Sequence, residues 1–389
     1  MYGVNDLGWA LGASLRILSR DLGRTIVGRW MALAVLIVAN VGLMAVISGG
    51  VGSVSDVIAP FTGHLMGFGL AASIALLLRG RILALLATGV AATLMVHAAL
   101  GWMRCCEAPK AMRSPLTAAK SWKPAQSLTV LNLNTGLNTG RASGDVGRIE
   151  QYLATAPADV VVLSEFDAGG SLLIASLREI YPYHVTCTSE QPCTLALLSR
   201  VPLEASGSAR IASGEPSFVW ARINPGGQGS TTIIGTQLNR PSGNPWLHEV
   251  QMRELAQFVR RLDGPLVLAG NLNTSPWSQS FRALRLATGL NPAATLMPSW
   301  PAWPIAVPQF ALDHIFVSAE LAVSAAGTGP AVGSDHLPVW AQLERQPIAA
   351  YPGRPPRGGS RLAAAGPHLG GQLLGDFGGE HGGTRDLSR

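Results

Sequence analysis

The pattern of hydrophobic and polar residues divides the chain into two regions of different texture. The first region holds three long apolar runs without Lys, Arg, Asp or Glu, namely Trp30–Val51, Val57–Leu78 and Ile82–Trp102. Each run would be about 30 Å long as an α-helix, which is enough to cross the hydrocarbon core of a bilayer. Soluble proteins also bury apolar helices, but three such runs in succession are unusual there. The pattern therefore predicts three transmembrane helices within residues 30–102.

The charges beside these runs predict an orientation. Four arginines precede the first run and two lie between the second and third: Arg16, Arg20, Arg24, Arg29, Arg79 and Arg81. The loop 52–56 carries only Asp56. Because Lys and Arg accumulate on the cytoplasmic side, residues 1–29 are predicted to be cytoplasmic and everything after residue 102 extracytoplasmic. In a bacterial cell this describes a multi-pass inner-membrane protein with a periplasmic C-terminal domain.

The second region, from about residue 127, has short apolar runs at regular spacing. They are Leu128–Leu133, Asp159–Leu163, Thr194–Leu198, Thr231–Gly235, Pro265–Ala269, Ile315–Val317 and Val339–Ala341, with helical patterns at Asp145–Ala154, Gly170–Ile180 and Leu247–Leu262. This alternation predicts one α/β domain over residues 127–346. Residues 103–126 are predicted to be a linker. The tail 347–389, rich in Gly and Pro, is predicted to be disordered.

Composition supports a membrane part and argues against a strong nucleic-acid binder. The chain is 48% hydrophobic and 13% charged, with a mean hydropathy of +0.27, which is too apolar for an ordinary soluble protein. The net charge is +6, but residues 127–346 hold 13 Lys+Arg against 16 Asp+Glu. The basic excess therefore lies beside the apolar runs, and the predicted domain lacks the basic face that nucleic-acid binding needs.

The cysteines bear on the compartment. Cys187 and Cys193 are separated by five residues that include Pro192, which suits either a loop closed by a disulfide in an oxidising compartment or two unpaired thiols. Cys105 and Cys106 follow the third apolar run. No Cys or His spacing typical of a zinc site is present in the sequence.

Polar residues stand at the ends of the predicted strands. They are Asn134, Glu165, Gln237, Asn271, Asn273, Asp313 and the triplet Ser334-Asp335-His336. A sheet brings such strand ends together in one crevice. Carboxylate and amide oxygens without a Cys or His cluster favour Mg²⁺ or Mn²⁺ over zinc.

The order and spacing of these segments resemble the endonuclease/exonuclease/phosphatase superfamily, which is deoxyribonuclease-I-like, over about residues 127–346. "LTVLNLN" resembles its first strand, "ADVVVLSE" the strand ending in a metal-binding Glu, and "LALLSRVPL" a central strand. "LVLAGNLNTSPWS" resembles the Gly-Asp-Phe-Asn strand, "ALDHIFVS" the Asp-His strand and "GSDHLPV" the terminal Ser-Asp-His. The resemblance implies a four-layered α/β sandwich, two packed β-sheets flanked by helices, here preceded by an α-helical transmembrane region. It also implies metal-dependent hydrolysis of phosphate esters.

The resemblance further implies individual roles. Glu165, with Asn134 nearby, would hold the divalent ion, and Asn273 would donate its amide to the phosphate. His336 would contact the scissile phosphate, oriented by Asp313 on its other ring nitrogen.

Asp335 would complete the metal or water network. The alternatives are that Glu165 is a solvated carboxylate and that Asp313 and His336 form only a structural pair. His314 is interpreted as structural and His184 as a surface or rim residue.

Two departures from the family pattern leave two hypotheses open. The family usually has Asp in place of Asn271, where it is thought to activate the attacking water, and His in place of Gln237. An amide does not accept a proton near neutral pH, and loss of a general base typically costs about 10²–10⁴-fold. The chain is then either a phosphoesterase in which Asp335 or the metal site replaces the base, or a catalytically silent domain that binds a phosphate-bearing headgroup. A serine hydrolase is excluded, because the sequence has no Gly-x-Ser-x-Gly motif.

The sequence leaves the substrate open among a phospholipid headgroup, a nucleic acid and a small phosphoester, with a lipid bilayer as the partner that anchoring implies. The segment 297–310, "MPSWPAWPIAVPQF", is predicted to lie on the rim of the site. Its Trp300 and Trp303 either grip an apolar or sugar part of a substrate or pack on the core.

Overall fold

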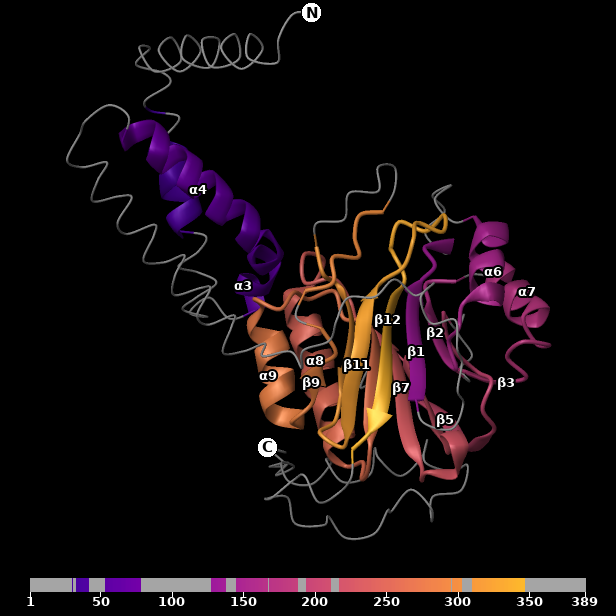
Figure 1. The fold of residues 1–389 in the computed structure, drawn as a ribbon. Coiled ribbons are helices and arrows are strands. Elements are labelled where there is room, and N and C mark those ends of the chain that lie inside the picture. Colours follow the sequence, from indigo (N-terminus) through magenta and orange to yellow (C-terminus); the bar gives the residue numbers. More distant parts are fainter. Residues whose placement is uncertain are drawn as a thin grey trace, which may run out of the picture.

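A computed structural model describes residues 30, 33–41, 53–77, 127–137, 145–166, 168–187, 194–210, 217–294, 296–302 and 310–346. In this part of the chain two six-stranded sheets pack face to face, with helices on their outer sides (Figure 1). The predicted third apolar run, linker and tail lie outside the described residues, as do Cys105, Cys106, Cys193 and Trp303.

The first sheet has the strand order β11-β12-β1-β2-β4-β3. Its strands are β1 Ser127–Asn134, β2 Val160–Ser164, β3 Tyr183–Thr186, β4 Leu195–Ser199, β11 Leu321–Thr328 and β12 Val339–Arg345. The pair β1 and β2 is parallel, whereas the other neighbours are antiparallel. Strands β2 and β4 are buried on both faces, which explains why they appear in the sequence as continuous apolar runs.

The second sheet has the order β5-β6-β7-β8-β10-β9. Its strands are β5 Leu203–Arg210, β6 Ser217–Ile223, β7 Thr231–Gln237, β8 Leu266–Asn271, β9 Asn291–Pro292 and β10 Asp313–Val317. The pair β7 and β8 is parallel and the others are antiparallel. The inner faces of the two sheets share one core, to which Val130 and Val162 contribute from one side and Val267 and Ile315 from the other.

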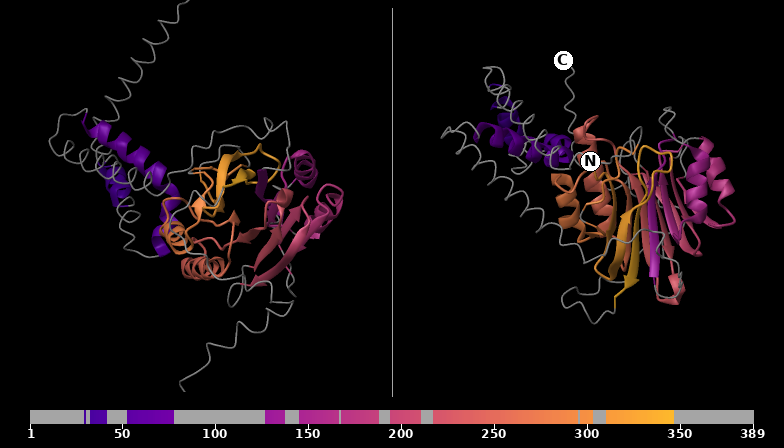
Figure 2. Two further views of the ribbon diagram at one scale, coloured as in Figure 1. Left: turned by 60° about the horizontal axis from the view of Figure 1, so that its bottom comes forward. Right: turned by 45° about the horizontal axis from the view of Figure 1, so that its top comes forward.

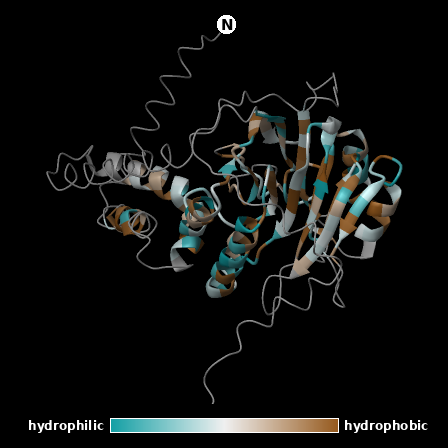
Figure 3. Ribbon diagram, turned by 90° about the horizontal axis from the view of Figure 1, so that it is seen from below, coloured by the Kyte–Doolittle hydropathy of each residue, from teal (hydrophilic) through white to brown (hydrophobic). Residues whose placement is uncertain are grey.

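Two pairs of helices form the outer layers (Figure 2). Helices α6 Val146–Thr155 and α7 Ala168–Ser176 cover the first sheet, and α8 Pro245–Arg260 and α9 Gln279–Thr288 cover the second. In α6, α8 and α9 the hydrophobic and hydrophilic residues lie on opposite sides, and the hydrophobic side is buried (Figure 3). The arrangement confirms the predicted α/β sandwich of two packed sheets flanked by helices.

A shorter helical region precedes the sandwich. Residues 33–41 are helical, and α3 Ser53–Ile58, a 3₁₀ turn at Ala59–Phe61 and α4 Thr62–Leu77 follow. Helix α3 packs on α8 and α9, whereas α4 points away from the sandwich (Figures 1 and 2). The predicted span Val57–Leu78 therefore begins at the end of α3 and continues through the 3₁₀ turn, and its longest continuous helix, α4, has 16 residues. Within the described ranges, no helix combines the length and apolarity needed to cross a membrane.

The structure also bears on the cysteines. Cys187 is buried at the end of β3 and is disulfide-bonded, which agrees with the first of the two alternatives for this thiol. The cysteine bonded to it lies outside the described residues.

Candidate active site

The carboxyl ends of β1, β2, β7 and β8 meet at one edge of the sandwich. Gln237, Asn271 and Asp313 are register partners on the three neighbouring strands β7, β8 and β10. On the other sheet Asn134 is paired with Ser164, directly before Glu165. The polar residues that follow the predicted strands are thus brought to one place.

Two side-chain hydrogen bonds join the sheets at this edge. Asn132 Nδ2 donates to Asp313 Oδ1 at 3.3 Å, and Gln237 Nε2 donates to Glu165 Oε1 at 2.5 Å. Glu165 adopts a left-handed conformation with φ of 55°, which is uncommon for a residue with a Cβ. The Glu165 carboxylate is therefore held by a turn and by an amide from the opposite sheet.

Asp313 and His336 form a buried pair. The distance from His336 Nδ1 to Asp313 Oδ2 is 2.6 Å, and the hydroxyl of Ser299 donates to the same oxygen at 2.6 Å. Both members are at most 1% exposed. The bond fixes the plane of the imidazole and leaves Nε2 for a ligand.

Charge at this edge favours the protonated imidazole. Burial alone would lower the pKa of His336. The charge of Asp313 and its hydrogen bond outweigh burial, with smaller effects from Asp335 and Glu165, and they raise the pKa above its ordinary value. His336 is therefore suited to donate a proton or a hydrogen bond to an anionic ligand.

The loop before β12 is tied to β1. Ser334 Oγ accepts from the backbone N–H of His336 at 3.0 Å and donates to the carbonyl of Asn134 at 2.7 Å. In the same loop, Asp335 Oδ2 accepts from Trp300 Nε1 at 3.3 Å. Asp335 Oδ1 is buried and has no hydrogen-bond partner within the described chain. Such an oxygen is a candidate ligand for a cation or a proton acceptor for water.

The two asparagines at the end of β8, Asn271 and Asn273, are already partly engaged in hydrogen bonds. Asn271 is fully buried, its Oδ1 accepts from the N–H of Asn273 at 2.9 Å, and its Nδ2 has no partner among the residues described. Asn273 has φ of 49° and donates from Nδ2 to the carbonyl of Leu238 at 2.7 Å. Because an amide nitrogen carries two hydrogens, the second hydrogen of Asn273 is left for the predicted contact with phosphate.

The oxygen donors at this edge fit a divalent ion that keeps most of its water. The described residues hold no group of three or more His, Cys, Asp or Glu placed to bind a metal. Mg²⁺, however, is often held by only one or two carboxylates. Glu165 and the unpartnered Asp335 Oδ1 supply two, and Asn134 Oδ1, which also accepts from the N–H of Gly136 at 3.0 Å, is a further oxygen at the end of β1. These residues fit Mg²⁺ or Mn²⁺ better than zinc.

The other two histidines lie apart from this chemistry. His314 is buried, its Nε2 is 2.7 Å from the carbonyl oxygen of Thr274, and its ring packs on Phe281. Burial lowers its pKa. His184 is exposed on β3. These positions agree with the interpretation of His314 as structural and His184 as a surface residue.

Sequence reasoning missed three contributors to the site: Asn132, Ser299 and the indole N–H of Trp300. Asn132 had a usable signal, because it stands two residues before Asn134 in a strand and side chains at that spacing share a face. Ser299 had none. Trp300 was predicted on the rim, but its bond to the site was not: its ring lies 5.7 Å from that of Phe310, and its indole N–H donates to Asp335.

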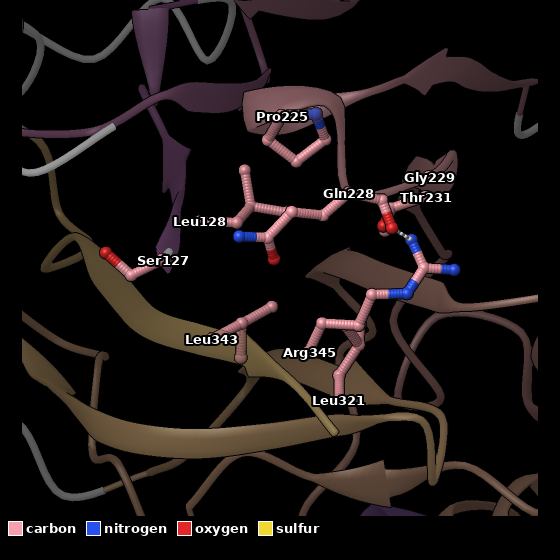
Figure 4. Close-up of a pocket in the computed structure, with 9 residues that line it drawn as sticks. All are labelled: Ser127, Leu128, Pro225, Gln228, Gly229, Thr231, Leu321, Leu343 and Arg345. Carbon is pink, nitrogen blue, oxygen red and sulfur yellow. Dashed lines mark hydrogen bonds between the residues drawn. The ribbon is translucent and has the colours of Figure 1, made fainter. Parts of the chain in front are cut away.

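A pocket at the opposite edge of the sandwich is separate from this site (Figure 4). It is lined by Ser127, Leu128, Pro225, Gln228, Gly229, Thr231, Leu321, Leu343 and Arg345. Arg345 Nη1 donates to the carbonyl of Gln228 at 2.6 Å. Since this pocket lies at the start of β1 and the end of β12, it shares no residue with the candidate active site.

Comparison with known proteins gives a family and related structures. The family model "Endonuclease/Exonuclease/phosphatase family" matches residues 130–336. An endonuclease/exonuclease/phosphatase from Beutenbergia cavernae is 21% identical and aligns over 57% of this chain and 72% of its own, with a TM-score of 0.48.

Two further structures align over all or nearly all of their own length. The human Nocturnin catalytic domain with bound sulfate is 17% identical over 60% of this chain and 100% of its own (TM-score 0.48). Sphingomyelinase C from Streptomyces griseocarneus is 21% identical over 56% of this chain and 99% of its own (TM-score 0.44). No curated protein sequence matches the chain. Similarities at this level of identity give no information on the substrate.

Proposed function

The chain belongs to the endonuclease/exonuclease/phosphatase family, and on that basis we propose that it hydrolyses phosphate esters with the help of a divalent metal ion. The observation that carries this proposal is the buried Asp313–His336 pair at 2.6 Å, placed where the strand ends of both sheets converge. A pair with a structural role alone would not require the surrounding carboxylates Glu165 and Asp335.

The chain's own groups suggest a division of labour. The protonated Nε2 of His336 contacts a phosphate oxygen, and Asp313 holds the ring in place and stabilises its charge. The free N–H of Asn273 binds a second phosphate oxygen. Asp335 Oδ1, which is buried and otherwise unpartnered in the described part of the chain, accepts the proton of the attacking water.

Glu165 and the amide oxygen of Asn134 would hold the metal ion, with Asp335 acting on the water beside it. When bound, Mg²⁺ or Mn²⁺ polarises a phosphoryl oxygen and offsets the negative charge that develops during attack. Gln237 holds Glu165 through its amide N–H, where the family usually has a His. This contact orients the ligand carboxylate but supplies no proton.

We also propose that residues 30–102 anchor the domain in a membrane, with residues 127–346 on the extracytoplasmic side. Apolar side chains that point to solvent support the anchor. Val38 and Val41 in the helical residues 33–41 are both 63% exposed, and Phe68 on α4 is 61% exposed. Exposed apolar groups of this kind are typical of a surface that meets lipid or another protein.

A second candidate function is favoured by Asn271. Its Oδ1 is engaged with Asn273 and its Nδ2 is a donor, so this position offers a ligand a hydrogen bond but no proton acceptor. A domain with this site would bind a phosphate-bearing headgroup without turning it over.

The experiment that tests the first proposal is hydrolysis of bis-p-nitrophenyl phosphate by the full chain in detergent, with and without Mg²⁺ or Mn²⁺. Glu165→Gln should abolish metal-dependent turnover, because it removes a ligand charge at constant size. Glu344→Gln is the matched control, since Glu344 is exposed at the opposite end of β12. Absence of turnover in the wild type together with phosphate binding in calorimetry would favour the second candidate.

A further inference from the structure

A segment outside the family domain packs on the helices and the loop beside the candidate active site. Helix α3 and the following turn, Ser53–Phe61, lie against α8 and α9, and α4 leads away from the sandwich (Figures 1 and 2). The contacts join residues as far apart in the sequence as Asp56 and Ser280, which are 224 positions apart, and Phe61 and Phe310. Two sets of contacts hold this segment, which we call the docking segment.

The first contact caps helix α9. Asp56 is 4% exposed, and its carboxylate accepts from the backbone N–H of Gln279 at 2.7 Å and of Ser280 at 3.2 Å. The helix's own N-cap, Ser278, makes no capping bond, because its hydroxyl accepts from the N–H of Ser275 at 3.0 Å instead. Asp56 therefore supplies from outside the domain the cap that α9 lacks, and its charge suits a helix N-terminus.

The second contact is a row of aromatic rings that ends at the site. The ring of Phe61 meets Phe310 edge-on at 5.1 Å, and His64 lies 5.3 Å from Phe310. Phe310 lies 5.7 Å from Trp300 and exchanges backbone hydrogen bonds with it, at 2.9 and 3.1 Å. Trp300 in turn donates its indole N–H to Asp335.

We propose that Asp56 and Phe61 are positioning residues, and that the active site is complete only when the docking segment is seated on the domain. Phe61 supports Phe310 and Trp300, and Trp300 fixes the carboxylate of Asp335. The indole N–H is the side-chain donor to Asp335 in the described structure, where Oδ1 has no partner. The effect on turnover rests on the proposed function, whereas the docking itself does not.

Hydrogen exchange in the full chain, in detergent micelles, tests the cap. Asp56→Ala should speed exchange of the Gln279 and Ser280 amides on the order of tenfold, since these N–H groups lose their acceptor. Asp56→Asn should recover most of the protection, because Asn is also a good N-cap. Wild-type exchange rates at both amides in Asp56→Ala would overturn the docking.

Phe61→Ala tests the link to the site, with Phe61→Tyr as the conservative variant that keeps the ring. Exchange of the Trp300 and Phe310 amides should rise on the order of fivefold in Phe61→Ala and return in Phe61→Tyr. With bis-p-nitrophenyl phosphate and Mg²⁺, kcat should fall by a similar factor and KM should stay constant, because Asp335 acts on the water and not on substrate binding. Phe68→Ala, two turns further along α4 and 61% exposed, should change neither quantity.

Three outcomes separate the inference from the proposed function. Unchanged exchange at Trp300 and Phe310 in Phe61→Ala overturns the positioning role. A rise in KM with constant kcat also overturns it, since the segment would then line the substrate site. If the wild type shows no turnover, the proposed function fails, and the exchange rates alone decide whether the docking segment orders the rim.

Discussion

Replacing Asn271 with Asp is expected to increase metal-dependent phosphodiester hydrolysis about 10²-fold. Asn271 is fully buried between its register partners Gln237 and Asp313. Its Oδ1 accepts from the N–H of Asn273, and a carboxylate oxygen makes the same bond. Asp has the same size as Asn, so the change places an oxygen where Nδ2 now lies. The Asn271 Nδ2 donor, which has no partner in the described structure, is thus replaced with an oxygen that can accept a proton. The neighbouring side chains do not need to move.

The magnitude follows from two opposing effects. A positioned general base contributes about 10²–10⁴-fold. Burial and the neighbouring carboxylate of Asp313 both raise the pKa of a new carboxyl group here, because each disfavours its charged form. The group would thus be only partly ionised near neutral pH, and Gln237 would still lack the chemistry of a His. We therefore expect the lower end of the range, with a gain that increases as the pH is raised.

The assay is kcat/KM of the full chain with bis-p-nitrophenyl phosphate and Mg²⁺, from about pH 6 to 9, the range in which such a base would ionise. Asn273→Asp is the matched control, since it adds the same charge two residues away. Equal gains in the two variants would show that charge, rather than a proton acceptor at position 271, is responsible. If Asn271→Asp folds and binds Mg²⁺ but is no faster than the wild type at any pH, the assignment of a missing base is wrong.

Three further changes are expected to act through single contacts. Asp313→Asn should lower kcat about 10²-fold, because His336 loses the charge that raises its pKa and orients its ring; steady-state kinetics check this, and a change under about threefold would contradict it. The free energy of unfolding should fall as the pH drops below about 6.5, because the lowered pKa of His314 keeps it neutral in the folded state while the unfolded chain binds a proton. The stabilising effect of neutral His314 is fully present above that pH. In urea unfolding, the free energy of unfolding should therefore fall less between neutral and acidic pH in His314→Gln than in the wild type. Gly270→Ala should prevent folding, because the new Cβ would lie 1.9 Å from a carbonyl oxygen of β7. Gly67→Ala is the control: its Cβ would meet open space on α4, so the midpoint of thermal unfolding should not change.

Strands that are buried along their whole length were predicted from the sequence, whereas the central strand β6, with four buried apolar residues, was not. β2, β4 and β8 are buried along their whole length and were predicted from continuous apolar runs. β5 and β11 are edge strands built largely of small and polar residues, and neither gave an apolar run. Their positions depend on pairing with a neighbour, which a pattern along one strand does not encode.

The sequence predicted the site residues that stand at the ends of strands, but not the contacts that loop residues make with them. Asp313 and His336 could be paired in advance by the family resemblance, and the structure places them 2.6 Å apart. The bond from Ser299 to Asp313 and that from Trp300 to Asp335 come from a loop whose path no periodicity determines. The contact of Asp56 with α9 could not be predicted either, because an isolated Asp beside an apolar run is typical of a loop between membrane helices.

Backbone strain and unsatisfied buried polar atoms at this edge cost folding free energy, which favours a site that binds a ligand over one that has lost its function. Glu165 and Asn273 hold left-handed conformations that typically cost about 1–3 kcal/mol each. Asn134 Nδ2, Asn271 Nδ2 and Asp335 Oδ1 are buried without partners in the described part of the chain, and a buried unsatisfied polar group typically costs about 1–3 kcal/mol. A chain that only had to fold would gain stability by losing these features, whereas a bound phosphate and cation would satisfy all three atoms. Binding therefore accounts for the geometry under both hypotheses, and they differ only in whether a group at this edge takes a proton from water.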